Sequence, residues 1–400
     1  MGSEDDRVVP HARDTPGLRA VTQVGRFFDS RAAYLLFSTA TNEKPVVAGR
    51  IGEELDKIAP GEKALQVLDA GMGDATVLTE LMRRLHRAFT HIPWLIVGKE
   101  ISLEDVRLSL DKVADRLLEH PEMVFVVTNM SYREAPHLVP MRDEARAALS
   151  WTTVPLEGST AFDFSRQIRD LYPSLVDDWA VRTSEKTGNP VYVRPSVLVL
   201  YRRDREFILS DIIPKPETPL GSGYQLIIAS QPYRARTSVD QKMSTVVAPL
   251  ARALAPRGRM VVVHSHGNDP GLEIIRGVWP DEDPFQTNRH VLADAARDHF
   301  VEPGDDELSF EPITDEEAII RYQLHAMPSD VQEHIGTSLI VAAWNAAAYV
   351  AQIDEERLSE ALSSGRYVPA TRRVIQQYEG VWFNDEAFVI TRAGPPIAPA

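Results

Sequence analysis

The chain has 400 residues, of which 44% are hydrophobic and 25% charged, and its formal net charge is −15. This length allows two domains or one large, elaborated domain, and an acidic balance spread along the chain disfavours binding to nucleic-acid phosphates. Because the sequence contains no cysteine, disulfides, thiolate metal sites and a cysteine nucleophile are excluded.

The N-terminal segment is predicted to lead into a helical cap. Residues 1–20 are polar, and the acidic start Met1–Asp6 lacks the apolar core of a secretory signal, so we expect a soluble cytoplasmic protein. Apolar residues then recur with helical spacing from Phe27 to Ile58, which predicts roughly two helices. We assign residues 1–60 to this lead-in and cap.

An α/β core is predicted to begin over residues 61–134. Ser102 and Asp105 have the spacing of a capping box at a helix start. Strands alternating with helices are typical of a doubly wound sheet, so we expect a Rossmann-like, mostly parallel sheet. The predicted elements are strands at 65–68, 94–98 and 123–127, with helices at 77–89 and 103–117 between them.

The alternation of strands and helices breaks over residues 135–222. Two short helical patterns are followed by strand-like runs at 191–193, 197–200 and 207–209. The polar run Arg202–Glu206 predicts a hairpin turn between the last two runs, and a proline- and glycine-rich linker follows. We expect an inserted α+β subdomain here.

The core is predicted to resume over residues 223–325, and residues 326–400 to form a helical elaboration with a final strand. The apolar stretch Ser338–Ile353 is shorter than the ~20 residues of a membrane span, so we expect no membrane insertion. It predicts a buried core helix or the interface of a homodimer. The predicted elements are strands at 224–229, 259–263, 318–325 and 387–390, with helices around 246–254, at 288–300 and over most of 330–377.

The segment Val67–Thr76 joins the first strand to the first helix through small residues at alternate positions. Its order, strand to glycine turn to helix, brings bare backbone close to a nucleotide-sized ligand. Asp69 precedes Gly71 and Gly73, and Ala75 stands at the third small position. A dehydrogenase usually has a third glycine and a pyrophosphate on the helix N-terminus, whereas an acid before the turn suits a ligand ammonium.

Glu100 ends the second predicted strand. A carboxylate there can accept hydrogen bonds from both ribose hydroxyls of an adenosine ligand. An acid that only stabilises the following helix start is the simpler alternative.

Together these motifs resemble the class I S-adenosylmethionine-dependent methyltransferases, and Leu254–Val263 is similar to that family's turn before its fifth strand. The resemblance implies S-adenosylmethionine as cofactor. It places Gly71 and Gly73 at the methionine moiety with Asp69 supporting it, and Glu100 at the ribose. The remaining cofactor-binding positions it implies are Ala75 in the turn, Asn129 with Met130 near the adenine, and Ser230 with Gln231 facing the methyl donor.

A finer resemblance links the two ends of the chain to histamine N-methyltransferase-like enzymes. It rests on Phe28–Asn42, Gly49–Gly52 and Trp382–Ile390. That family uses an acid in the lead-in to hold the substrate amine; here Asn42 stands in that position and Glu43 is adjacent. The substrate-binding residues that we predict are Asn42 and the aromatic residues Tyr34, Phe37 and Tyr233, whose ring faces suit a cationic amine.

His264 and His266 follow the fifth core strand. Strand alternation points both side chains to one face at the carboxyl end of the sheet, where such sheets bind ligands. We predict one of them as general base or as a hydrogen-bond partner of the substrate. The main alternative is an ordinary loop role. A metal pair with Asp269 is conceivable, but we predict a site without metal.

Together with the resemblance, these observations predict a methyltransferase that works by in-line methyl transfer. A small-molecule acceptor is expected because the cap and the insertion can close over the pocket. N-methylation is slightly favoured over O- or S-methylation. Two alternatives stay open: an NAD(P)-dependent oxidoreductase, and a non-catalytic cofactor-binding subunit.

Overall fold

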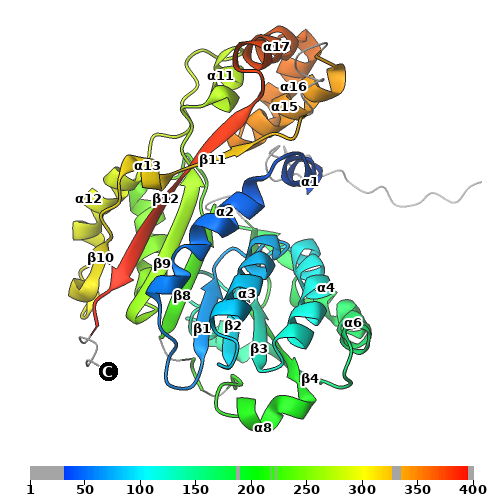
Figure 1. The fold of residues 1–400 in the computed structure, drawn as a ribbon, viewed down its shortest axis with the longest axis vertical. Coiled ribbons are helices and arrows are strands. Elements are labelled where there is room, and N and C mark those ends of the chain that lie inside the picture. Colours follow the sequence, from blue (N-terminus) through cyan, green and yellow to red (C-terminus); the bar gives the residue numbers. More distant parts are fainter. Residues whose placement is uncertain (1–30, 186–189, 217, 221–222, 327–334, 395–400) are drawn as a thin grey trace, which may run out of the picture.

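The computed structural model describes residues 31–185, 190–216, 218–220, 223–326 and 335–394 (Figure 1). The lead-in up to residue 30, including Phe27 and Phe28, lies outside the described residues. Among those described, no helix combines the length and apolar character needed to cross a membrane.

A ten-stranded sheet forms the centre of the molecule, in the order β10-β12-β9-β8-β1-β2-β3-β7-β4, with β11 also paired to β12. The five central strands β9, β8, β1, β2 and β3 are parallel to one another. On either side of them, β7 runs antiparallel to β3 and β12 runs antiparallel to β9. The strands are β1 Leu65–Asp69, β2 Trp94–Lys99, β3 Met123–Thr128, β4 Ser150–Leu156, β7 Ser196–Arg202, β8 Tyr224–Ser230, β9 Leu254–Ser265, β10 Leu308–Phe310, β11 Ile319–Gln323 and β12 Trp382–Arg392, with a separate pair β5 Val181–Thr183 and β6 Pro190–Tyr192.

Helices cover both faces of the sheet. Alternate strand residues pack to opposite sides: Val67 joins the apolar cluster under α3 and α4, and Leu68 joins the cluster under α9, α10 and α12. The predicted doubly wound, mostly parallel sheet is therefore confirmed. The helices are α1 Arg31–Ala40, α2 Glu43–Gly52, α3 Thr76–Ala88, α4 Leu103–Glu119, α5 Asp143–Ala147, α6 Ala161–Asp170, α7 Tyr172–Asp178, α8 Glu206–Leu209, α9 Val239–Lys242, α10 Ala248–Ala251, α11 Pro270–Arg276, α12 Arg289–His299, α13 Asp315–Ala318, α15 Thr337–Val350, α16 Glu355–Ser364 and α17 Tyr367–Tyr378.

A third apolar cluster holds the C-terminal helices together. Figure 1 shows α11 and α15–α17 gathered at one end of the molecule, with α1 beneath them. The cluster joins Trp344 of α15 to Phe37 of α1 and Phe383 of β12. Much of the apolar stretch predicted as core or dimer interface thus packs into the core of its own chain, and the homodimer stays a prediction.

The segment 135–222 differs in part from its prediction. Its strands β4 and β7 extend the main sheet beyond β3. Phe207–Leu209 is not a strand but lies in α8, with Phe207 93% exposed, and no hairpin turn forms at Arg202–Glu206. The apolar run predicted a strand, but only Leu209 of its three residues is buried, which suits one side of a short helix. The domain boundaries given above stay predictions.

Candidate functional site

A cavity of about 440 Å³ lies at the carboxyl ends of β1, β2 and β8. This is the edge at which parallel sheets present their loops to a ligand. The described residues that line it are Tyr34, Phe37, Glu43, Lys44, Val47, Asp69, Gly71, Met72, Gly73, Asp74, Val77, Glu100, Ser102, Glu104, Asp105, Ile228, Ser230, Gln231 and Tyr349.

The glycine turn forms part of the wall of this cavity, which Gly71 and Gly73 both line. The Asp69 carboxylate ends β1 and accepts the N–H of Gly71 at 3.3 Å. Gly73 has a φ of 53°, in the left-handed region that favours glycine. Ala75, also left-handed with a φ of 59°, is fully buried and precedes α3, so it shapes the turn without lining the cavity.

Glu100 joins the end of β2 to the glycine turn. Its carboxylate accepts N–H groups from Gly73 at 2.8 Å, Ile101 at 2.7 Å and Ser102 at 2.8 Å. Burial raises the pKa of Glu100. The predicted capping box is therefore half formed: the Ser102 hydroxyl accepts the N–H of Asp105, but the Ser102 N–H is bound by Glu100.

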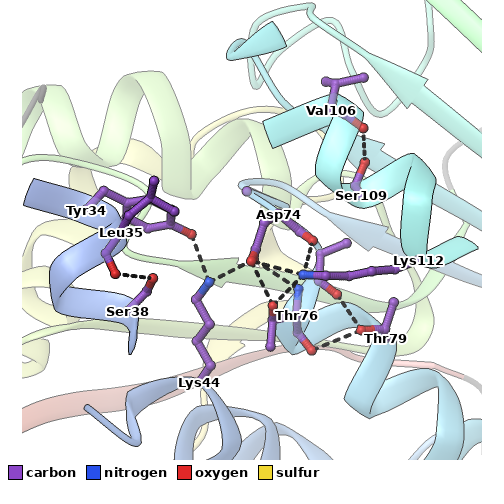
Figure 2. A network of polar contacts seen from close by, with 12 residues as sticks. Tyr34, Leu35, Ser38, Lys44, Asp74, Thr76, Thr79, Val106, Ser109 and Lys112 are labelled. Carbon is purple, nitrogen blue, oxygen red and sulfur yellow. Dashed lines mark hydrogen bonds and ion pairs between the residues drawn. The ribbon is translucent and has the colours of Figure 1, made fainter. Parts of the chain in front are cut away.

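Asp74, which sequence reasoning missed, lies at the centre of a polar network beside the cavity (Figure 2). Its carboxylate accepts hydrogen bonds from Lys44 at 2.8 Å, Lys112 at 2.9 Å and the backbone N–H of Thr76 at 3.2 Å. Lys44 also donates to the Tyr34 hydroxyl at 2.9 Å. Burial alone would raise the pKa of Asp74, but the two lysines outweigh it and hold that pKa well below its usual range.

The lining of the cavity is rich in acidic side chains. Among the described lining residues, Lys44 is the one basic side chain, against six acids: Glu43, Asp69, Asp74, Glu100, Glu104 and Asp105. Burial raises the pKa of both Glu43 and Asp69 to about 7. Such a site favours a cationic ligand, whose charge would stabilise the ionised carboxylates.

The predicted substrate residues of the cap separate into two groups. Tyr34 and Phe37 line the cavity, and Phe37 stacks on Tyr349 of α15 with ring centroids 4.8 Å apart. Asn42 does not line it, because its side-chain oxygen accepts the N–H of Gln323 in β11 at 2.7 Å. The neighbouring Glu43 faces the cavity instead.

Asn129 and Met130 are held in the protein interior and are absent from the cavity lining. Both amide hydrogens of Asn129 are used, on the carbonyls of Asp178 and Arg194 at 3.0 Å each, and its side-chain oxygen accepts the N–H of Ser196 at 2.8 Å. Met130 is fully buried in an apolar cluster. Asn129 thus fixes the junction of β3 and β7, and the geometry gives no support to its predicted contact with adenine.

Ser230 and Gln231 line the cavity at the end of β8, and their contact with a methyl donor stays a prediction. Gln231 adopts a φ of 48°. Its side-chain nitrogen donates to Asp385 at 3.0 Å, and its oxygen accepts from the Ser265 hydroxyl at 3.3 Å. Asp385 is fully buried in β12, and burial, followed by the charge of Glu43, raises its pKa well above the usual value.

His264 and His266 do not line this cavity. His264 is buried, with Nε2 3.0 Å from Glu386 and Nδ1 2.8 Å from the Tyr233 hydroxyl. Burial lowers the pKa of His264, so the ring is neutral: Nε2–H donates to the carboxylate, and Nδ1 accepts from Tyr233. Asp269 caps α11 through the N–H of Leu272 at 2.8 Å. Both ring nitrogens of His264 are thus engaged within the protein, and the general-base role of His264 or His266 stays a prediction.

Comparison with known proteins finds no matching family model and no matching curated protein. Solved structures similar to the chain include a protein from Galdieria sulphuraria described as a sarcosine dimethylglycine methyltransferase, with 10% identity, 91% of this chain and 86% of that chain covered, and a TM-score of 0.33. A geranyl diphosphate methyltransferase in complex with SAM has 10% identity over 86% of this chain and 85% of that chain, with a TM-score of 0.32. PKMT2 from Rickettsia typhi, in complex with AdoHcy, has 10% identity over 89% of this chain and 54% of that chain, with a TM-score of 0.28. At these TM-scores the similarities assign neither family nor function to this chain.

Proposed function

We propose that the chain is an S-adenosylmethionine-dependent methyltransferase that acts on a small amine. The observation that carries this proposal is the cavity of about 440 Å³ in which the glycine turn meets Asp69 and Glu100 at the carboxyl edge of a parallel sheet. Its charge, six acids against one lysine, complements a cofactor with a sulfonium and an ammonium group.

The residues present fit that cofactor. A volume of about 440 Å³ lies within the ordinary range of small-ligand sites. Asp69 lines the cavity and would hold the ammonium group, with the bare backbone of Gly71 beside it. Three backbone N–H groups already bind Glu100. A carboxylate has about four acceptor positions, so Glu100 retains about one for a ribose hydroxyl.

When bound, the cofactor would supply a methyl group on a positively charged sulfur; the contribution of the chain is to position and to desolvate the acceptor. Glu43 would hold the acceptor nitrogen and take up the proton that an ammonium must lose before its lone pair is available. Burial raises the pKa of Glu43 to about 7, which suits proton uptake near neutral pH. Phe37 and Tyr34 would enclose the cation with their ring faces.

The dinucleotide alternative is disfavoured by Asp74. A pyrophosphate would rest on the N–H groups at the start of α3. The Asp74 carboxylate already accepts the N–H and the hydroxyl of Thr76 there, at 3.2 and 2.9 Å. Phosphate groups would also meet the acids that line the cavity.

Titration calorimetry with S-adenosylmethionine, S-adenosylhomocysteine and NAD⁺ tests the proposal. We expect both sulfur ligands to bind and NAD⁺ not to bind. Gly71→Arg should abolish binding because its side chain would fill the cavity, while Glu62→Arg, outside the cavity lining, should bind like the wild type.

Binding of NAD⁺ alone, or unchanged binding by Gly71→Arg, would overturn the assignment. The non-catalytic alternative predicts cofactor binding without release of S-adenosylhomocysteine. A product-release assay across amine acceptors separates it from the proposed enzyme.

A further inference from the structure

Lys242 carries a charge that its surroundings leave largely uncompensated. Its side chain is 2% exposed, at the end of α9. The ammonium donates to the carbonyl of Ala235 at 2.8 Å and lies 5.1 Å from the centre of the Tyr233 ring. No carboxylate among the described residues forms an ion pair with it. A buried ammonium normally has such a partner, because burial without one is costly.

The Lys242 side chain lines a second, smaller cavity. The described residues around that cavity are Gln231, Tyr233, Ala235, Lys242, His264, Ser265, Phe285, Thr287 and Gln352. Its volume of about 10 Å³ suits one water-sized group, such as a single carboxylate oxygen. Gln231 also lines the larger cavity and therefore lies between the two.

The two cavities have opposite charge. The larger one collects six carboxylates, whereas the smaller one has the Lys242 ammonium and no acid among its described lining residues. A molecule that spans Gln231 would meet negative charge at one end and positive charge at the other. The matching ligand is a zwitterion, with a cationic group for the larger cavity and an anionic group for the smaller one.

We propose that the cavity beside Lys242 is a carboxylate subsite, and that the methyl acceptor is an amino acid whose amine lies in the larger cavity and whose carboxylate meets Lys242. The second half of this statement rests on the proposed function. Lys242 supplies the charge and Thr287 a hydroxyl donor. Tyr233 contributes packing alone, because its hydroxyl hydrogen is donated to His264.

Acetate provides a direct probe of the subsite, because its binding needs no methyl transfer. By calorimetry, acetate should bind the wild-type protein and the surface variant Lys63→Gln equally. Lys242→Gln keeps a donor for the Ala235 carbonyl but loses the charge, so we expect its acetate affinity to fall ~10-fold or more. Equal acetate affinity in folded Lys242→Gln and wild type would overturn the subsite.

A second measurement uses the wild-type protein alone. Burial lowers the pKa of Lys242 to about 8, so at pH 8.5 most of its amine is unprotonated. A carboxylate partner raises that pKa, so acetate binding should take up protons at pH 8.5 and almost none at pH 6.5. Binding without proton uptake at pH 8.5 would contradict the subsite. If acetate binds in this way but S-adenosylmethionine does not bind, the proposed function fails while the anion subsite stands.

Discussion

At the scale of single residues, Asp69 links the charge of the site to pH. Burial raises its pKa to about 7, so below pH 7 the carboxyl is largely protonated in the free protein. A cationic ligand binds the ionised form, and the affinity for S-adenosylmethionine should therefore rise from pH 6 to pH 8, by ~10-fold per pH unit at most for one group. Calorimetry at several pH values measures this slope.

The Asp69→Asn variant isolates the contribution of this residue. It should bind S-adenosylmethionine more weakly at pH 8 and with a shallower pH dependence, the remaining slope coming from Glu43. Asp143→Asn, whose side chain is 94% exposed in the wild type, serves as the control. Because the folded-state pKa of Asp69 lies above its unfolded value, the free protein loses stability as pH rises through this range. Asp69→Asn should therefore melt higher than the wild type at pH 8, and an unchanged slope with an unchanged melting temperature would refute the argument.

At the scale of elements, Lys44 links the cap helices α1 and α2 to the glycine turn through hydrogen bonds. From the start of α2 it binds Tyr34 of α1 and Asp74 ahead of α3 (Figure 2). Lys44→Met should cost about 1–2 kcal/mol, because the ion pair is largely buried at 13% and 18% exposure. Hydrogen exchange should quicken in α1 and α2, while Lys63→Met, which loses a solvent-exposed pair, should leave it unchanged. Equal exchange in both variants would show that other contacts hold the cap.

This network also shows where prediction from the sequence stops. The turn Asp69–Ala75 and the strand end at Glu100 were predictable, because backbone geometry ties glycine spacing and strand ends to local contacts. Lys44 and Lys112 lie 30 and 38 residues from Asp74 in the sequence. Their contacts with Asp74 depend on how the helices pack, which local sequence spacing does not predict. The same holds for Asn129, whose partners Asp178 and Arg194 come from the segment 135–222.

At the scale of the whole molecule, the order of strands brings distant parts of the chain together. The C-terminal strand β12 lies between β9 and the edge strands β10 and β11, so the end of the chain completes the sheet. Periodicity predicted β12 as a strand but not its position in the sheet, because the alternation of side chains does not depend on which strands are its neighbours. The contacts of Asp385 with Gln231 and of Glu386 with His264 follow from that position. They could not be predicted from the sequence.

The C-terminal helices are expected to support the site through α15. Trp344 is fully buried there between Trp279 and Tyr367, and Tyr349 of the same helix stacks on Phe37 at the cavity. Trp344→Ala should lower the free energy of unfolding by about 3–5 kcal/mol, the usual cost of removing a buried aromatic ring. Since α1 packs on α15, the same variant should weaken binding of S-adenosylmethionine.

Val341 offers a matched control on the same helix, because its side chain is 37% exposed. Val341→Ala should change stability by less than about 1 kcal/mol and leave ligand binding unaltered. Denaturant unfolding measures the change in stability, and titration calorimetry measures ligand binding. If Trp344→Ala loses stability but binds the cofactor like the wild type, the C-terminal helices stabilise the fold without shaping the cavity, and the aromatic wall of Tyr34 and Phe37 is held by the cap alone.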